Sequence, residues 1–134
     1  MVLLVTTPEP TSIADTYSAL KNIVHIRGAE EIWLVVNRAE NKLEGIRVAE
    51  RLEAICEQFM QLKIQTLGYV INDDKVAEGV LRQQPVITLY PRSLAASNFR
   101  AITEKLVADE TKINSFPKRS GLKGFLTKVL EFVK

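Results

Sequence analysis

The side chains able to do acid–base, nucleophilic or metal chemistry are few and scattered. His25 is the only histidine and Cys56 the only cysteine, so one chain can build neither a Ser-His-Asp triad nor a histidine-based metal site. Cys56 lies in an apolar helical pattern that is typical of a buried thiol. Asp73 and Asp74 are the type of pair that binds metal or transfers protons, but acidic residues before a helix more often cap it. We predict no catalytic residue and no metal ligand.

A glycine-rich phosphate site is also missing from the sequence. None of the six glycines belongs to the pattern G-x-x-x-x-G-K-[ST], whose backbone amides and lysine hold nucleotide phosphates. No strand ends in an aspartate of the Walker B type, which would hold magnesium. We therefore expect no ATP hydrolysis by this chain alone. Glu9 follows a strand, at the edge where open α/β sheets bind ligands, and is a further candidate.

The C-terminal tail (residues 118–134) combines basic charge with an apolar helical face. Five bases and one acid give it a net charge of about +4, whereas thirteen bases and fifteen acids remain elsewhere. Such a helix lies in the headgroup region of an anionic membrane. The residues predicted to contact membrane are Lys118, Arg119, Leu122, Lys123, Phe125, Leu126, Lys128, Val129, Leu130, Phe132 and Val133.

Other roles for the tail stay open. Its apolar face would also pack against its own or a neighbouring chain's core, or bind a groove in a partner protein. Nucleic acid is not expected, because the interleaved aromatics of a stacking surface are missing. No apolar run is long enough to span a bilayer, and a single cysteine and the absence of a signal-peptide pattern indicate an intracellular protein.

Strands alternate with helices along residues 1–108, which predicts an α/β fold with a mostly parallel sheet and flanking helices. We expect fully buried strands at 2–5 and 32–36, a polar loop at 37–41, a strand at 64–71 and a fourth extended run at 86–90. Helices are expected from about 10 to Gly28, from an Asn41–Glu44 capping box onward, from Asp73 or Asp74 to about Arg82, and over 93–107.

The inner faces of the longer helices follow from their apolar spacing. The expected inward residues are Ile13, Tyr17, Leu20 and Val24, then Val48, Leu52, Ile55, Cys56 and Phe59, and finally Ala95, Phe99, Ile102 and Leu106. Gly68 is expected at a point of close approach. Residues 109–120 are polar and predict a linker, followed by an amphipathic helix over 121–134.

A strand at residue 2 has no upstream strand to pair with. We interpret the chain as the second half of a larger α/β domain, either natural or produced by truncation. An unpaired strand edge invites association, so we also expect a homo-oligomer.

Taken together, these segments resemble the C-terminal half of the MinD/ParA-type (deviant Walker) ATPases, and most closely the FlhG/YlxH flagellar-number regulators. The resembling stretches are Leu3-Leu-Val-Thr-Thr-Pro-Glu-Pro-Thr-Ser-Ile-Ala-Asp15, Leu34-Val-Val-Asn-Arg38, Leu67-Gly-Tyr-Val-Ile-Asn-Asp-Asp-Lys-Val76, Gln84-Pro-Val86, Ala95-Ala-Ser-Asn-Phe99 and the terminal amphipathic helix. The resemblance implies a partial P-loop NTPase fold of the SIMIBI class.

The resemblance also implies a nucleotide. In that family, the asparagine that matches Asn37 contacts adenine, and the later loop that matches Asn72 and Asp73 borders the base. Arg38 accompanies Asn37. Many relatives carry proline at the position of Asn72, so that loop departs from the family pattern. ATP and magnesium belong to the intact family, and we expect neither to be bound by this chain.

By this resemblance, the parent proteins use ATP-dependent dimerisation at the inner face of the cytoplasmic membrane to set the number or position of flagella or division sites. The expected partners are an anionic membrane, a second copy, and flagellar or division-site proteins. The alternative is a non-enzymatic interaction module whose terminal helix binds a partner or sister subunit.

Overall fold

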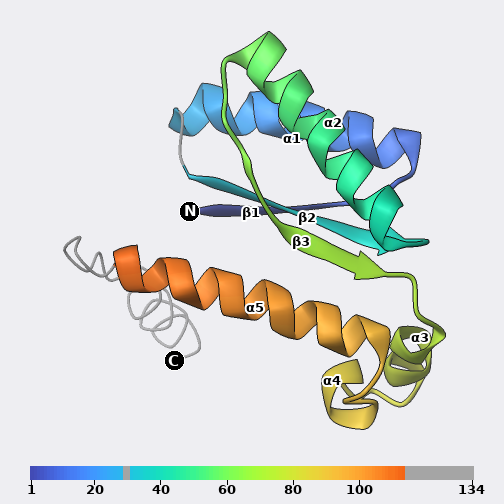
Figure 1. Cartoon of the computed structure of the whole chain (residues 1–134). Coiled ribbons are helices and arrows are strands. Elements are labelled where there is room, and N and C mark those ends of the chain that lie inside the picture. Colours follow the sequence, from blue (N-terminus) through green and yellow to red (C-terminus); the bar gives the residue numbers. More distant parts are fainter. Residues whose placement is uncertain (29–30, 114–134) are drawn as a thin grey trace, which may run out of the picture.

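A three-stranded parallel sheet is the frame of the structure, a computed structural model that describes residues 1–28 and 31–113. The strand order is β1-β2-β3, and helices cover both faces (Figure 1). The elements in chain order are β1 (Val2–Thr6), α1 (Pro10–Arg27), β2 (Ile32–Ala39), α2 (Lys42–Met60), β3 (Gln65–Ile71), α3 (Asp74–Leu81), α4 (Val86–Leu89) and α5 (Leu94–Ile113). The predicted α/β class with a parallel sheet is confirmed.

The helix boundaries follow from local chemistry. Pro10 occupies the first turn of α1, where its missing N–H costs nothing. Gly28 ends that helix with a φ of 77°, which glycine adopts without strain. The Asn41 side chain accepts a hydrogen bond from the Glu44 amide (3.0 Å) and begins α2. The Glu44 carboxylate accepts from the Glu40 amide (2.7 Å), one residue earlier than in a standard capping box.

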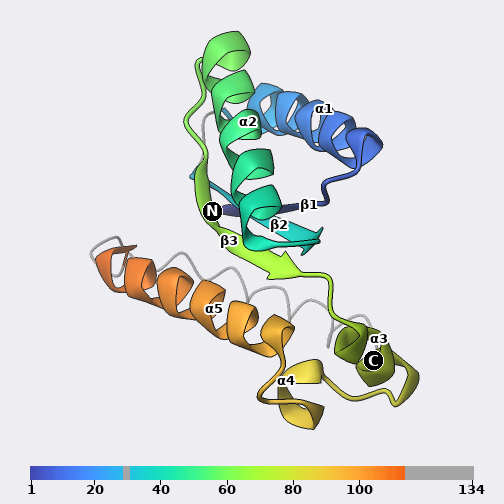
Figure 2. The ribbon, with the colours of Figure 1, turned by 45° about the vertical axis from the view of Figure 1, so that its right-hand side comes forward.

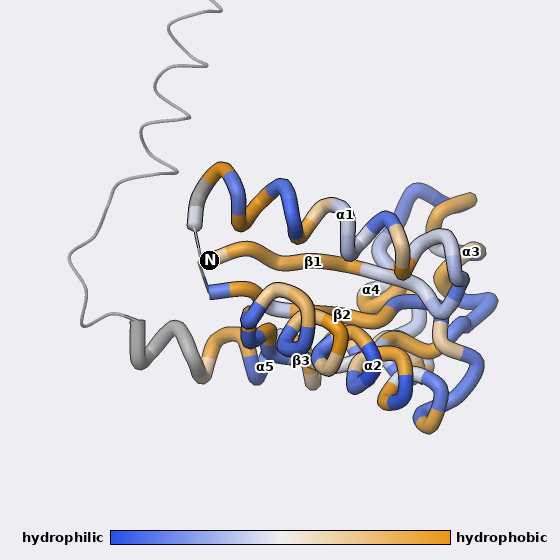
Figure 3. Tube along the Cα trace, turned by 90° about the horizontal axis from the view of Figure 1, so that it is seen from above, coloured by the Kyte–Doolittle hydropathy of each residue, from blue (hydrophilic) through white to orange (hydrophobic). Residues whose placement is uncertain are grey.

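Two apolar layers hold the sheet between its helices. α1 and α2 lie on one face and α5 on the other, as Figures 1 and 2 both show. The layer under α1 and α2 contains Leu20, Ile32, Leu34, Val36, Ala49, Leu52, Cys56, Leu62 and Ile64, and the layer under α5 contains Trp33, Val35, Leu67, Val70 and Ala95. Central β2 is therefore buried on both faces, and Figure 3 shows the strands as the apolar interior.

The prediction that residues 2–5 are fully buried is wrong. Leu3 and Val5 are exposed, whereas Val2 and Leu4 are partly buried. β1 forms an edge of the sheet, and α1 covers one face only. The side chains of a strand alternate between faces, so Leu3 and Val5 point to the face on which α5 packs against β3 and leaves β1 open.

Two predicted non-helical segments also differ in the structure. Residues 86–90 are not extended: Val86–Leu89 is the one-turn helix α4, with the amides of Thr88 and Leu89 donating to the Pro85 carbonyl (3.0 Å each). A short apolar run does not distinguish strand from buried helix, and these local bonds satisfy the backbone without a neighbouring strand. α5 continues through Ile113, so residues 109–113 are helical where a linker was predicted.

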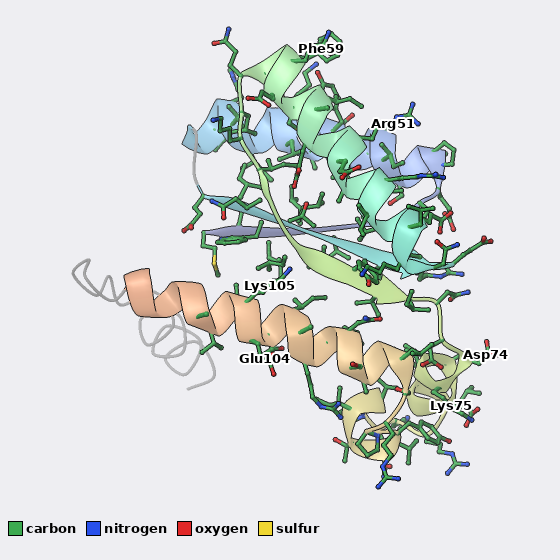
Figure 4. The ribbon with its side chains drawn as sticks, viewed as in Figure 1. Arg51, Phe59, Asp74, Lys75, Glu104 and Lys105 are labelled. Carbon is green, nitrogen blue, oxygen red and sulfur yellow. The ribbon has the colours of Figure 1, made fainter. Side chains whose placement is uncertain are left out.

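Helix-face predictions were correct near the sheet and wrong at helix ends. Leu20, Leu52 and Cys56 are fully buried. Phe59, predicted to face inward, is 66% exposed in the last turn of α2 (Figure 4), because the sheet no longer lies beneath it. Phe99 is also partly exposed, at the flank of α5.

The close approach predicted at Gly68 is confirmed. A Cβ at this position would lie 3.0 Å from Cγ1 of Ile102, so the glycine lets α5 sit against β3. A tighter contact, which the sequence did not indicate, occurs at Gly45 on the opposite face. There an added Cβ would lie 2.7 Å from both Cβ and Cγ of Tyr69.

Candidate functional site

The four residues predicted from the resemblance to border adenine come together at the carboxyl edge of the sheet. β2 and β3 are adjacent and parallel, and Ala39 pairs with Ile71. The Asn72 amide donates to the Ala39 carbonyl (2.8 Å), which ties the two strand ends together. One hollow of about 390 Å³ is lined by Asn37, Arg38, Ile71, Asn72, Asp73, Asp74, Val76 and Ala77. Its volume falls within the range of about 300–1,000 Å³ typical of small-molecule sites.

An irregularity in β2 gives Asn37 and Arg38 their positions. The strand register shifts between Val36 and Ala39, so these two residues lie outside the regular ladder. Arg38 has a φ of 58°, a conformation that side-chain-bearing residues seldom adopt. Bulges and strained residues concentrate next to binding sites, where they redirect side chains. Residues 37–39 of the predicted loop at 37–41 therefore form a bulged strand end, and residues 40–41 connect it to α2.

The Asn37 carboxamide is half-buried and keeps hydrogen-bonding capacity. Its Oδ1 accepts from the Arg38 amide (2.9 Å). A carboxamide oxygen has two lone pairs and its nitrogen has two protons, so this one bond leaves both donor and acceptor capacity toward the hollow. Arg38 and Asn72 are exposed at the same edge. The site can therefore offer a ligand the carboxamides of Asn37 and Asn72 and the positive charge of Arg38.

Asp73 has a structural task, as the capping interpretation predicted. Its Oδ1 accepts from the Lys75 amide (3.0 Å) and so caps α3, while its Oδ2 accepts from the Ala95 amide (3.2 Å) in the first turn of α5. Asp74 is exposed in the first turn of α3 (Figure 4). Both carboxylate oxygens of Asp73 thus accept hydrogen bonds. Asp73 lines the hollow and holds the first turns of α3 and α5 together.

Glu9 borders a second hollow on the other side of Arg38. This space of about 330 Å³ is lined by Thr7, Pro8, Glu9, Arg38, Glu40, Glu44 and Asn72. Within the described part of the chain, the buried hydroxyl of Thr7 has no hydrogen-bond partner. The sequence did not single out Thr7, although its place after β1 is the signal that would have found it. The carboxyl ends of all three strands therefore carry polar groups.

A second polar cluster, missed in the sequence, joins α3 to the segment after α4. Lys75 pairs with Glu78 (2.6 Å), Tyr90 donates to the other oxygen of Glu78, and the Lys75 ammonium lies 4.7 Å from the Tyr90 ring centre. The hydrogen bond from Lys75 lowers the pKa of the Glu78 carboxyl, and the same bond raises the pKa of Lys75. Hydrogen bonding to Glu78 raises the pKa of the Tyr90 phenol. The spacing Lys75-x-x-Glu78 was visible in the sequence, but the distant tyrosine was not.

Other sequence predictions concern residues outside this edge. The predicted amphipathic helix over 121–134 and the membrane-contacting residues from Lys118 to Val133 lie outside the described residues. Over 1–28 and 31–113, no helix is long and apolar enough to cross a bilayer. In the same ranges, no group of three or more His, Cys, Asp or Glu side chains has the arrangement of a metal site. Cys56 is buried as predicted, and burial raises the pKa of its thiol.

Comparison with known proteins identifies relatives along nearly the whole chain. No family model matches the sequence. The antiactivator FleN of Pseudomonas aeruginosa is 30% identical over 125 residues, which is 93% of this chain and 42% of FleN. The flagellum site-determining protein YlxH of Helicobacter pylori is 28% identical over 134 residues, 98% of this chain and 45% of YlxH.

The septum site-determining protein MinD of Bacillus subtilis is 26% identical over 130 residues, 97% of this chain and 46% of MinD. The chain thus spans less than half the length of each of these relatives. Their agreement with one another and with the parallel α/β fold shows that the chain belongs to the MinD/FlhG-type ATPase family, of which it represents a C-terminal part.

Proposed function

We propose that this chain forms the base-side wall of the nucleotide site in a regulator of flagellar number or placement. Two relatives are named for the flagellum or for antiactivation and one for septum placement, which favours this kind of role. The observation that carries the proposal is the single hollow lined by Asn37, Arg38, Asn72 and Asp73. The family resemblance predicts adenine contact by Asn37 and a base-bordering loop at Asn72 and Asp73, and these residues lie at the neighbouring ends of β2 and β3.

The chemistry of this hollow fits a purine base. The Asn37 carboxamide offers a donor and an acceptor, which matches the amino group and ring nitrogen of an adenine edge. Val76 and Ala77 supply apolar surface for the flat ring. Bound ATP, together with a magnesium ion, would supply the phosphate and metal chemistry of the parent family. The 134 residues contain no phosphate-binding loop, so the proposal assigns them recognition of the base and no hydrolysis.

Membrane association is proposed to reside in the tail. Its basic amphipathic pattern would bind the inner face of the cytoplasmic membrane weakly, because a helix this short is marginal in water and a few cations contribute modestly. Two tails on one dimer would raise the avidity by orders of magnitude. ATP-dependent dimerisation of the parent protein would then control attachment.

Association between copies has its own support. Among the described residues, the outer edge of β1 pairs with no strand, and β1 carries no charge or proline that would protect it. A second copy is therefore a proposed partner, alongside flagellar or division-site proteins.

Adenosine titration followed by two-dimensional NMR tests the base-side assignment. We expect a Kd on the order of 1 mM, shifts confined to residues of the hollow, and loss of binding in Asn37→Ala. The matched control is Asn22→Ala, which removes an exposed carboxamide on α1. Equal shifts with guanosine would refute selectivity for adenine, and unchanged adenosine binding in Asn37→Ala would refute the role of Asn37 in base recognition. ATP turnover by the purified chain that Asn37→Ala abolishes would refute the proposal that hydrolysis lies elsewhere.

The second candidate is a non-enzymatic interaction module. An apolar hollow of about 400 Å³ between α3, α4 and α5 favours this alternative, because none of Asn37, Arg38, Asn72 and Asp73 lines it. Co-sedimentation with anionic vesicles separates the two readings of the tail. Membrane binding that survives both Phe125→Asp and Leu126→Asp would exclude the tail as the anchor.

A further inference from the structure

The turn that joins α3 to α4 exposes apolar side chains at one extremity of the structure. We call residues 80–87 the α3–α4 tip. Its exposed fractions are 72% for Val80, 84% for Leu81 and 48% for Ile87. Figure 2 shows α3 and α4 at the end farthest from α1 and α2. Single exposed apolar residues are ordinary, but three within eight residues at one end of the structure need an explanation.

The backbone of the tip is well tied, so these side chains are held outward. The Gln83 amide donates to the Val80 carbonyl (3.0 Å), and the Gln84 amide donates to the Gly79 carbonyl (2.9 Å). An added Cβ at Gly79 would lie 2.8 Å from the Gln84 carbonyl oxygen, so the close turn requires glycine. The cluster of Lys75, Glu78 and Tyr90 braces its base.

Positive charge accompanies this apolar surface. Residues 74–100 contain four bases (Lys75, Arg82, Arg92 and Arg100) and two acids (Asp74 and Glu78), a net charge of +2. Outside this segment and the tail, nine bases face thirteen acids. Glu78 is already paired with Lys75, whereas Arg82 and Arg92 are exposed beside the tip. Residues 74–100 and the tail are thus each net positive, whereas the remaining residues taken together are net negative.

We propose that the α3–α4 tip is a second membrane contact, with Val80, Leu81 and Ile87 entering the interface of an anionic bilayer. Arginines beside them would bind lipid phosphates, which the planar guanidinium contacts through two N–H groups at once. Moving aliphatic side chains from water to the acyl boundary is favourable because it removes apolar surface from water. The backbone of the tip is already held by hydrogen bonds, so insertion costs little conformational entropy. Val80 and Ile87 also line the apolar hollow between α3, α4 and α5, and the exposed Arg82 and Arg92 make this region complementary to an anionic lipid surface.

The tip precedes α5 in the sequence, and the tail follows it. This helix has 20 residues, so its ends are about 30 Å apart at 1.5 Å per residue. Two weak contacts on one chain would bind a surface more tightly than either alone. Only this avidity rests on the proposed membrane role of the tail. The proposed membrane contact of the tip is argued from Val80, Leu81, Ile87 and the neighbouring arginines, independently of the tail.

Vesicle co-sedimentation of the full chain with point variants tests the proposal. The probe is vesicles of phosphatidylcholine with phosphatidylserine, compared with phosphatidylcholine alone. Leu81→Asp is expected to weaken binding to the anionic vesicles about tenfold. Ile26→Asp is the matched control, because Ile26 is 78% exposed on α1, far from the tip. Equal binding by Leu81→Asp and Ile26→Asp overturns the proposal.

Tail variants separate this proposal from the proposed function. If Leu126→Asp binds normally and Leu81→Asp binds weakly, the tip is confirmed and the tail anchor is refuted. If Leu126→Asp alone abolishes binding and Leu81→Asp has no effect, the tip proposal is overturned and the tail anchor stands. A lower mass of Leu81→Asp by light scattering, with unchanged vesicle binding, assigns the tip to contact between copies and likewise overturns it.

A local probe gives a readout that folding defects would not mimic. An environment-sensitive dye on Leu81→Cys, in a Cys56→Ala background, should shift to shorter wavelength with anionic vesicles. The same dye on Ile26→Cys should not shift. Equal wavelength shifts of the dye at both positions on adding anionic vesicles would refute insertion of the tip.

Discussion

Asp73 offers the sharpest test of how the carboxyl edge is held together. One carboxylate accepts the Lys75 amide (3.0 Å) at the start of α3 and the Ala95 amide (3.2 Å) at the start of α5. Asp73→Ala removes both acceptors at once, while the neighbouring Asp74→Ala changes an exposed carboxylate that makes neither contact.

The expected cost follows from the two amides separately. Loss of a helix N-cap destabilises by about 1 kcal/mol, within a range of roughly 0.5–2. Ala95 is fully buried, so its unpaired N–H adds a desolvation cost of about 1–3 kcal/mol. Asp73→Ala should therefore lower the free energy of unfolding by about 2–4 kcal/mol. Asp73→Asn keeps one acceptor oxygen and should lose roughly half of this.

Urea unfolding monitored by circular dichroism measures these free energies, and hydrogen exchange locates them. The amides of Lys75 and Ala95 should exchange faster in Asp73→Ala, ahead of amides in β2. Asp74→Ala should cost less than about 1 kcal/mol, the upper end of a helix-terminus charge effect. If Asp73→Ala and Asp74→Ala prove equally stable, the double cap does not hold the two helices as described.

Three further predictions concern the core and the polar cluster. Phe59→Ser should change the free energy of unfolding by less than about 1 kcal/mol because Phe59 is mostly exposed, whereas Leu52→Ala should cost about 2–5 kcal/mol, both by urea unfolding. The folded-state pKa of Glu78 is lowered by Lys75, so this pair stabilises the fold above the ordinary carboxyl pKa and the contribution is lost as pH falls through the folded value. Glu78→Gln should accordingly flatten the acid side of the stability–pH curve, and an unchanged curve would exclude the pair. Burial raises the pKa of Cys56, so a disulfide reagent should modify it about a hundredfold faster in urea than in the native protein, and equal rates would contradict its burial.

The parallel sheet was predictable because its signals are local and redundant. The apolar run at Ile32–Val36 is buried on both faces, and the polar residues Asn41 and Asp73 cap helices where their positions indicated. Each of these elements needs only its own sequence and one neighbouring layer. The position of Asn37 beside Asn72 then follows from topology, since the carboxyl ends of adjacent parallel strands meet at one edge.

The incorrect predictions concern residues that lie beyond the edge of the sheet or of the helices that cover it. Leu3 and Val5 are apolar, as residues of a buried strand are, but no described helix covers their side of β1. Phe59 continues the apolar face of α2 beyond the end of the sheet. The run at Val86–Leu89 forms a helix turn because Pro85 offers local carbonyl bonds and no strand edge is beside it. Periodicity indicates which face of an element is apolar, and only tertiary contacts show whether something lies against that face.

The same distinction explains why the exposed apolar residues are informative. A misjudged core position such as Phe59 is a single residue with acidic and polar neighbours, which is ordinary for a protein surface. Val80, Leu81 and Ile87 differ, because they lie within eight residues whose backbone is tied by hydrogen bonds, and the exposed Arg82 lies among them in the sequence. Charge of that sign would favour either an anionic lipid surface or the acidic remainder of a second copy, and comparing vesicle binding with the mass of the Leu81→Asp variant separates these two partners. If the tail has its proposed membrane role, one anionic surface would account for the chemistry of both the tip and the tail.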